Sequence, residues 1–176
     1  PLLAGFVAAL DLELSPHTRS TYIGYSAGAA LVGTGEREGL TAANIIYLAP
    51  SGSGNGINGV EDTPNPEAHR YWIQARDDPI ILAQWFGGIS QGGDPEQMGV
   101  IRLESGFTDH GGRSPLVSGH EEYFLPESTA MENMRRVIRG RNVYPYVPDE
   151  AFVDEGGVWA YSPLHNNPQD YTGDKM

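Results

Sequence analysis

Three kinds of side chain that together can cleave an acyl bond occur in a single order along the chain. Ser26 is the centre of Gly24–Gly28, which fits the pattern G-x-S-x-G. Asp78 follows it, and His120 comes last. A serine hydroxyl becomes a nucleophile when an imidazole removes its proton, and a carboxylate on the other ring nitrogen fixes the tautomer of that imidazole. Because this order accompanies G-x-S-x-G on parallel sheets, the sequence predicts a Ser26-Asp78-His120 triad.

The serine is flanked by a β-prone run on one side and a small, apolar run on the other. Residues Ser20–Tyr25 are rich in β-branched and aromatic side chains, which predicts a strand. Residues 27–32 are Ala, Gly, Ala, Ala, Leu and Val, as expected of a helix that packs closely against a sheet. We expect this helix to run to about Arg37 and to end before Gly39.

Ser26 is therefore predicted at a sharp turn between a strand and a helix. We expect Gly24 and Gly28 to remove Cβ atoms that would collide at this turn. The Ala27 N–H would then lie at a helix N-terminus, which makes it the candidate oxyanion donor. Tyr25, beside the serine, is the candidate substrate-binding residue. The alternative for Ser26 is a capping serine in a tight turn.

Two adjacent aspartates compete for the acid position. Asp78 is the better candidate, because Asp78-Pro79-Ile80 leads directly into the next predicted helix. Asp77 remains an alternative, with its side chain otherwise facing solvent.

Two histidines compete for the base position. His120 is followed by Tyr123, Phe124 and Leu125, which we expect to act as apolar anchors that fix the end of a loop over the sheet. His110 is the rival, but its glycine-rich, polar neighbours indicate an exposed turn. The other histidines are His17 and His69, beside the amino-terminal ends of predicted strands, and His165, in the carboxyl-terminal region.

The remaining apolar patterns predict the strands and helices that would position Ser26, Asp78 and His120. The other predicted strands are residues 44–49, 69–75 and 99–104, and the other predicted helices are residues 2–14, 80–86 and 127–139. In the last helix the side chains expected to face inward are Met131, Met134, Val137 and Ile138. Alternating strands and helices predict an α/β fold with a mostly parallel sheet and helices on both faces. Functional groups collect beyond the carboxyl ends of such strands, where all three triad residues are predicted.

The domain organisation is simple. We expect residues 1–140 to form the core and residues 141–176, rich in proline and aromatic residues, to form an irregular tail that packs on the core or extends from it. Residues 50–66 are a long loop of glycine, proline and polar residues. Such a loop is either a rim or lid over a site or disordered.

Charge and composition exclude several classes of function. The net charge is -12 without a basic cluster, so nucleic acid and anionic membrane surfaces are unfavourable partners. The acidic residues are spread along the chain, as expected of a solvated surface. There is no cysteine, which excludes disulfides, thiolate metal sites and a cysteine nucleophile. Lys175 is the only lysine, so a catalytic lysine is not expected.

No cofactor or metal is predicted. The stretch Ser51–Gly56 is rich in glycine but lacks the lysine of a phosphate-binding loop, and Asp109-His110 is an isolated pair of potential metal ligands. No apolar run approaches the roughly 18 to 20 residues that span a bilayer, and no signal-peptide pattern opens the chain. The sequence favours neither secretion nor the cytoplasm.

At these residues the sequence resembles the α/β-hydrolase fold and, more narrowly, the actinobacterial α/β-hydrolase family known as DUF1023. The matching segments, in the order of that family, are Gly24–Gly28, Ala49–Gly52, Asp78–Ile80, Gly93–Pro95, Met98-Gly99 and His120–Phe124. The resemblance implies the same triad of Ser26, Asp78 and His120. Tyr25 and Ala27 stand where His and Tyr are usual, which implies a differently shaped pocket around the same nucleophile.

The resemblance also implies that part of the full fold is missing. In the α/β-hydrolase fold the nucleophile follows the fifth strand, so the four predicted strands correspond to the fifth to eighth. The first strands, and the loop that gives the second oxyanion N–H, have no counterpart before Ser20. The strand before Ser26 would then be an unpaired apolar edge, which natural proteins avoid. We expect this chain to be the carboxyl-terminal portion of a larger protein or to pair with a second chain.

These features together predict a serine hydrolase that cleaves an ester, either a carboxylic ester or a lipid-like acyl substrate, through an acyl-enzyme. The preference for esters over peptides comes from the resemblance, because esterases and lipases dominate this fold. The alternative is a binding or interaction module that keeps the fold without turnover. A haloperoxidase or an acyltransferase is a third, weaker hypothesis.

Overall fold

The structure is a computed structural model that describes residues 2–85, 91–95, 100–110, 114–148, 152–154 and 159–161. Its elements, in chain order, are α1 (Leu2–Glu13), β1 (Thr21–Tyr25), α2 (Ala27–Arg37), β2 (Asn44–Leu48), η1 (Val60–Asp62), β3 (His69–Ile73), α3 (Ile80–Trp85), β4 (Ile101–Leu103), η3 (Glu122–Phe124), α4 (Thr129–Ile138), β5 (Phe152–Asp154) and β6 (Trp159–Tyr161). Each strand and helix predicted from the sequence corresponds to one of these elements. Gly99 and Phe86, at two of the predicted ends, lie outside the described residues.

Four of the strands form a mostly parallel sheet in the order β1-β2-β3-β4. β1 and β2 pair in parallel, from Thr21 opposite Asn44 to Tyr25 opposite Leu48. All five residues of β2 are buried, as expected for a parallel strand that is covered on both faces. The predicted α/β class is therefore confirmed. Within the predicted tail, β5 and β6 pair antiparallel as a separate two-stranded sheet.

The chain divides into two compact units, each of which is discontinuous in sequence. The first unit consists of Pro1–Trp72 and Pro79–Ile101, and the second consists of Ile73–Asp78 and Arg102–Met176. Ser26 belongs to the first unit, whereas Asp78 and His120 both belong to the second.

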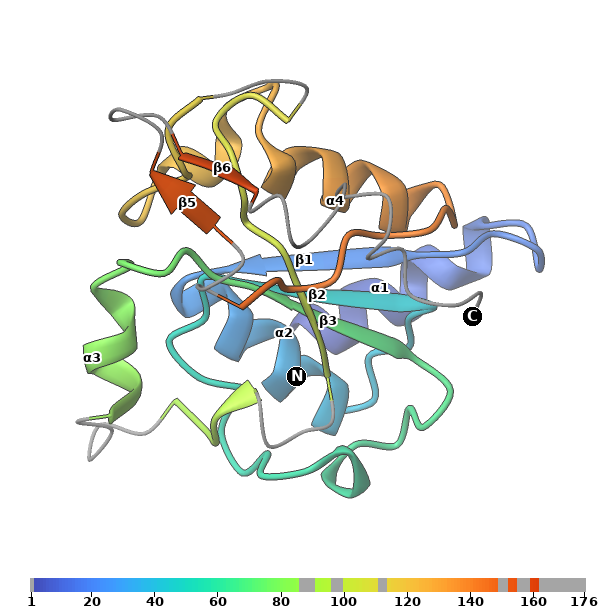
Figure 1. Ribbon diagram of the computed structural model, residues 1–176. Coiled ribbons are helices and arrows are strands. Elements are labelled where there is room, and N and C mark those ends of the chain that lie inside the picture. The colour runs from blue at the N-terminus through green and yellow to red at the C-terminus, as the bar shows by residue number, and fades with distance from the viewer. Residues whose placement is uncertain are drawn as a thin grey trace. The chain divides into compact units, whose positions relative to one another are not determined.

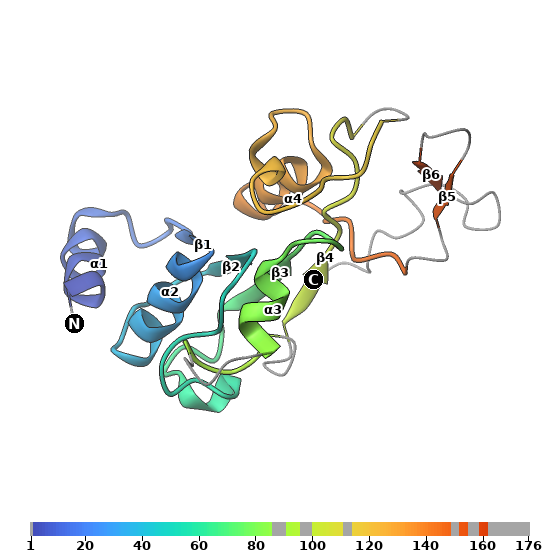
Figure 2. The same ribbon diagram turned by 90° about the vertical axis from the view of Figure 1, so that its left-hand side faces the viewer.

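In the first unit, α2 packs against β1 and lies beside α1 (Figures 1 and 2). Its buried side chains form one cluster with β2, made of Ala29, Val32, Ile45 and Tyr47. A second cluster consists of Ala4 and Val7 of α1 together with Leu40, which follows α2. Phe6 shares the helical spacing of the apolar residues of α1, yet 63% of its surface is exposed.

The loop after β2 packs on α2. A Cβ atom at Gly33 would lie 1.7 Å from the carbonyl oxygen of Ser53, so glycine is required where this loop crosses the helix. Ser53 is buried, and its hydroxyl donates to the carbonyl groups of Ile57 and Gly93 at 3.0 and 2.9 Å. The first part of the predicted long loop is thus held against the core by hydrogen bonds.

A buried ion pair joins the end of α2 to β3. Glu36 is fully buried and accepts a hydrogen bond from Arg70 at 2.5 Å and another from the hydroxyl of Tyr47 at 3.0 Å. Arg70 also donates to the hydroxyl of Thr63 and to the carbonyl of Asn65. The charges therefore compensate each other inside the protein, which the sequence-based prediction of a solvated acidic surface did not foresee.

In the second unit, α4 is capped at both ends. The hydroxyl of Ser128 accepts from the Met131 N–H at 3.1 Å, and Gly140 has a φ of 60° just beyond the helix. Met134 and Val137 are buried, as predicted. Ile138 is 55% exposed, so the prediction that it faces inward is wrong.

Candidate active site

The turn that carries Ser26 has a strained backbone. β1 ends at Tyr25 and α2 begins at Ala27, with Ser26 between them at φ 54° and ψ -123°. This is close to the first central residue of a type II′ turn, at about φ 60° and ψ -120°, a position that glycine dominates. Its N–H donates to the carbonyl of Leu48 at 2.9 Å, and its carbonyl accepts from the Ser51 N–H at 3.3 Å. The Ser26 side chain makes no capping hydrogen bond to α2, which argues against the capping alternative.

The two glycines of the pentapeptide differ in their roles. A Cβ atom at Gly24 would lie 2.5 Å from Cα of Ala29, so the close approach of β1 to α2 requires a glycine there. A Cβ atom at Gly28 would meet nothing within 4 Å, so the prediction of a collision at Gly28 is wrong. Ala27 is exposed at the first position of α2, where backbone N–H groups have no acceptor within the helix. Tyr25 is half-buried.

Asp78 and His120 are in direct contact. Nδ1 of His120 lies 3.0 Å from each carboxylate oxygen of Asp78. A carboxylate only accepts, so Nδ1 carries the proton and Nε2 is the basic nitrogen of the neutral ring. Asp78 is completely buried at its side chain, whereas 27% of the His120 side chain is exposed. The arrangement is therefore a buried carboxylate that orients an accessible imidazole.

Asp77, the alternative acid, has a different set of partners. Its carboxylate accepts from the hydroxyl of Ser118 at 2.6 Å and from the N–H of Gly119 at 3.0 Å. Gly119 has a φ of 63°, in the left-handed region that favours glycine. Asp77 thus holds the turn that immediately precedes His120.

Tyr123 is the member of this cluster whose polar role the sequence did not reveal. Its side chain is completely buried, and its hydroxyl donates to Oδ2 of Asp78 at 2.5 Å and accepts from the N–H of Ala75 at 2.7 Å. The prediction that it anchors the loop is confirmed. Phe124 and Leu125 are 47% and 39% exposed, so they are not the buried anchors that we expected. Tyr123 follows His120 by three residues in the sequence. This short spacing was the available sign that both side chains could contact Asp78.

Arg76 completes the attachment of the turn that bears Asp78. Its guanidinium forms two hydrogen bonds with the buried carboxylate of Glu104, at 2.7 and 3.0 Å, and a third with the carbonyl of Val147 at 2.6 Å. Glu104 also accepts from the backbone of Gly106 and of Val147. Every residue from Ala75 to Asp78 is thus bonded to the region 104–147.

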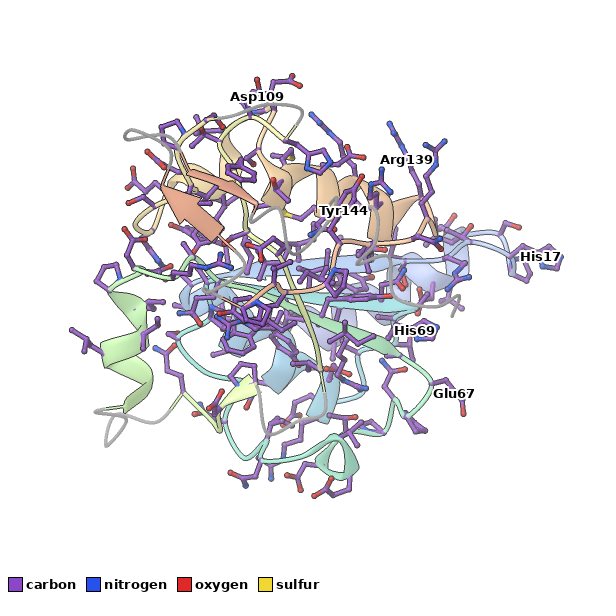
Figure 3. The ribbon with its side chains drawn as sticks, in the orientation of Figure 1. His17, Glu67, His69, Asp109, Arg139 and Tyr144 are labelled. Carbon is purple, nitrogen blue, oxygen red and sulfur yellow. The ribbon has the colours of Figure 1, made fainter. Side chains whose placement is uncertain are left out.

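His110 has other partners than Asp78. Its Nδ1 lies 3.3 Å from Oγ1 of Thr129, and its ring centroid lies 4.5 Å from that of Tyr144. The residue is half-buried rather than in an exposed turn, and this burial lowers its pKa from the usual value of 6.5. Tyr144 is labelled in Figure 3.

The other histidines lie away from the acid–base pair in the sequence. His17 precedes β1 and His69 begins β3, so both are at amino-terminal strand ends, and they project on the same side of the first unit (Figure 3). His165 lies outside the described residues.

The described part of the chain has neither a cluster of metal ligands nor a membrane-spanning helix. There, no group of three or more His, Asp and Glu residues is arranged to hold a metal ion. Among the same residues, no helix combines the length and the apolar character needed to cross a bilayer.

Comparisons with models of protein families, with curated proteins and with solved structures gave no match.

Proposed function

We propose that the protein is a serine hydrolase that acts on an ester or another acyl substrate, with Ser26 as the nucleophile. The observation that carries this proposal is the hydrogen-bonded pair of Asp78 and His120, at 3.0 Å, with the carboxylate buried and the imidazole accessible. Such a pair makes Nε2 a proton acceptor that is held in one tautomer. The strained conformation of Ser26 is the second support, because strain of this kind concentrates at functional positions.

In the proposed reaction the first half forms an acyl-enzyme. Oγ of Ser26 attacks the carbonyl carbon of the substrate while Nε2 of His120 takes the hydroxyl proton. The oxyanion that develops accepts a hydrogen bond from the Ala27 N–H at the start of α2. The carbon–oxygen bond to the leaving alcohol then breaks, and His120 returns its proton to that alcohol.

The second half regenerates the enzyme. Water attacks the acyl carbon as it gives a proton to Nε2 of His120. The bond to Oγ of Ser26 breaks, the carboxylic acid leaves, and the proton passes from His120 to Oγ. Throughout, Asp78 remains a carboxylate that stabilises the imidazolium. Tyr25, next to the nucleophile, would contact the substrate.

The finer fold assignment is part of the same proposal. We infer an α/β-hydrolase-like arrangement, of the kind that the DUF1023 resemblance implies, with the site beyond the carboxyl ends of the strands and helices on both faces of the sheet. β1 is the first strand in the sheet order, and Ile23 at its centre is 39% exposed. We therefore propose that a further strand, from a second chain or another segment, covers this edge. Sizing by light scattering tests this: a stable monomer that does not aggregate would count against it.

Covalent labelling tests the function directly. A fluorophosphonate reacts much faster with an activated serine than with an ordinary hydroxyl, so we expect one adduct on the wild-type chain by intact mass. Ser26→Ala should remove that adduct completely. Ser15→Ala is the matched control, because Ser15 is exposed and lies outside the proposed site, and it should leave labelling unchanged.

Each result has a distinct meaning. An adduct that depends on Ser26 supports the hydrolase and justifies a screen of ester substrates. A folded wild-type chain without an adduct contradicts the hydrolase and favours the binding module. If the label is present but added acyl acceptors divert the product from the free acid, the activity is acyl transfer.

A further inference from the structure

The hydroxyl of Tyr123 connects the acid, the base and the end of β3. It donates to Oδ2 of Asp78 at 2.5 Å, and the same oxygen accepts from Nδ1 of His120 at 3.0 Å. It also accepts from the N–H of Ala75 at 2.7 Å. Because the side chain is completely buried, water does not replace either hydrogen bond.

The backbone of Tyr123 is itself fixed by α4. Its carbonyl accepts from the hydroxyl of Ser128 at 3.1 Å, and that hydroxyl caps α4 through the Met131 N–H. The next residues are held as well, since the Ser128 N–H donates to the carbonyl of Leu125 at 3.0 Å. The tyrosine hydroxyl therefore has a defined position relative to the helix.

A buried carboxylate needs hydrogen-bond donors in place of the water that it has lost. Loss of the Tyr123 hydroxyl would remove one donor from the Asp78 carboxylate in a place that water does not reach. It would also remove a contact that limits rotation of this carboxylate, to which the ring of His120 is hydrogen-bonded. A short hydrogen bond from a hydroxyl to a carboxylate is among the stronger hydrogen bonds in proteins. Here it fixes the position of Oδ2 of Asp78.

From this geometry we propose that Tyr123 is a positioning residue of the acid–base pair: its hydroxyl holds the Asp78 carboxylate in the orientation in which it accepts from His120. The inference rests on the proposed function for its meaning in catalysis. The contact between the hydroxyl and the pair can be tested separately, by a measurement that does not require turnover.

The test is Tyr123→Phe, which keeps the ring and removes only the hydroxyl. Tyr47→Phe is the matched control, because Tyr47 is also completely buried and its hydroxyl also donates to a buried carboxylate, that of Glu36. Both variants lose a hydrogen bond from a buried tyrosine to a buried carboxylate, and Tyr123→Phe also loses the hydrogen bond from the Ala75 N–H. Tyr47→Phe therefore controls for the loss of a buried tyrosine hydroxyl, and only Tyr123→Phe removes a contact with Asp78.

The first readout is the resonance of the Nδ1 proton of His120, observed by NMR in the ¹⁵N-labelled protein. We expect Tyr123→Phe to shift or broaden this resonance and Tyr47→Phe to leave it unchanged. The second readout is the rate of fluorophosphonate labelling of Ser26, which we expect to fall about 10- to 100-fold in Tyr123→Phe, as loss of a hydrogen bond to a charged group implies.

The inference is overturned if the Nδ1 resonance is the same in Tyr123→Phe and wild type. It is equally overturned if Tyr47→Phe moves that resonance as much, because the effect would then be a general loss of stability. If the wild-type chain is not labelled at all, the proposed function fails, and the resonance alone still decides whether Tyr123 is coupled to the pair.

A second variant keeps the test valid if Tyr123→Phe does not fold. Asp78→Asn removes the charge from the acceptor of the Tyr123 hydroxyl. In this variant the hydroxyl proton of Tyr123 is observed by NMR instead of the Nδ1 proton of His120. We expect that hydroxyl resonance to move in Asp78→Asn relative to wild type. An unchanged resonance would overturn the inference.

Discussion

Replacing Ser26 by glycine should stabilise the protein, although it removes the proposed nucleophile. Ser26 adopts φ 54° and ψ -123°, which costs a residue with a Cβ atom about 1 to 3 kcal/mol. Glycine relieves this strain but loses more conformational freedom on folding, at about 0.5 to 1 kcal/mol. Subtracting the second range from the first gives a net stabilisation of about 0 to 2.5 kcal/mol, and we expect about 1 kcal/mol.

The assay is the free energy of unfolding from urea denaturation, with two controls. Ser26→Ala removes the hydroxyl and keeps the Cβ atom, so it should not gain this stabilisation. Ala27→Gly introduces glycine at the adjacent exposed helical position, where it should destabilise by about 1 kcal/mol. If Ser26→Gly is destabilised as much as Ala27→Gly, the turn is not strained and the argument from strain to function is refuted.

Two further predictions concern groups outside the proposed site. Glu36→Gln should lower the free energy of unfolding by about 3 kcal/mol in urea titrations, because it leaves the buried charge of Arg70 without its carboxylate; a loss below about 1 kcal/mol would contradict this. The pKa of His110 is lowered chiefly by burial and also by Arg136, while Glu132 and Asp109 oppose the shift, so the folded protein resists protonation. Stability should therefore fall as the pH drops from the unfolded-state pKa of 6.5 through the lower folded-state pKa. His110→Phe should reduce the pH dependence of the free energy of unfolding over this range. If the slope of that free energy against pH is the same as in the wild type, His110 is not the group responsible.

The features that the sequence predicted well are local ones. The turn at Ser26 depends on a strand, a glycine and a helix that are adjacent in the chain, so its conformation follows from neighbouring residues. β2 was predicted from one continuous apolar run. The choice of Asp78 over Asp77 depended on Pro79, which begins the next helix, and the hydrogen bond to His120 agrees with that choice.

The features that the sequence did not predict depend on distant partners. Glu36 and Glu104 look like ordinary surface acids in a chain of net charge -12, and only the arginines that the fold brings to them make their burial possible. Tyr123 looks like an apolar anchor until the hydroxyl meets Asp78, which lies 45 positions earlier. Ile138 fits the helical spacing, but a spacing does not reveal where the neighbouring surface ends.

The way in which Ala75–Asp78 is held by a later part of the chain affects how the protein can be made and divided. Asp78 leaves the ribosome 42 residues before His120, so the pair cannot close until the later segment has been synthesised. A single break anywhere between these residues gives two fragments, neither of which contains both the acid and the base. Recombination that exchanged the second unit intact would need three crossovers, one before Ile73, one after Asp78 and one before Arg102. Asp78 and His120 therefore belong to the same compact unit, although the gene segment that separates their codons encodes part of the other unit.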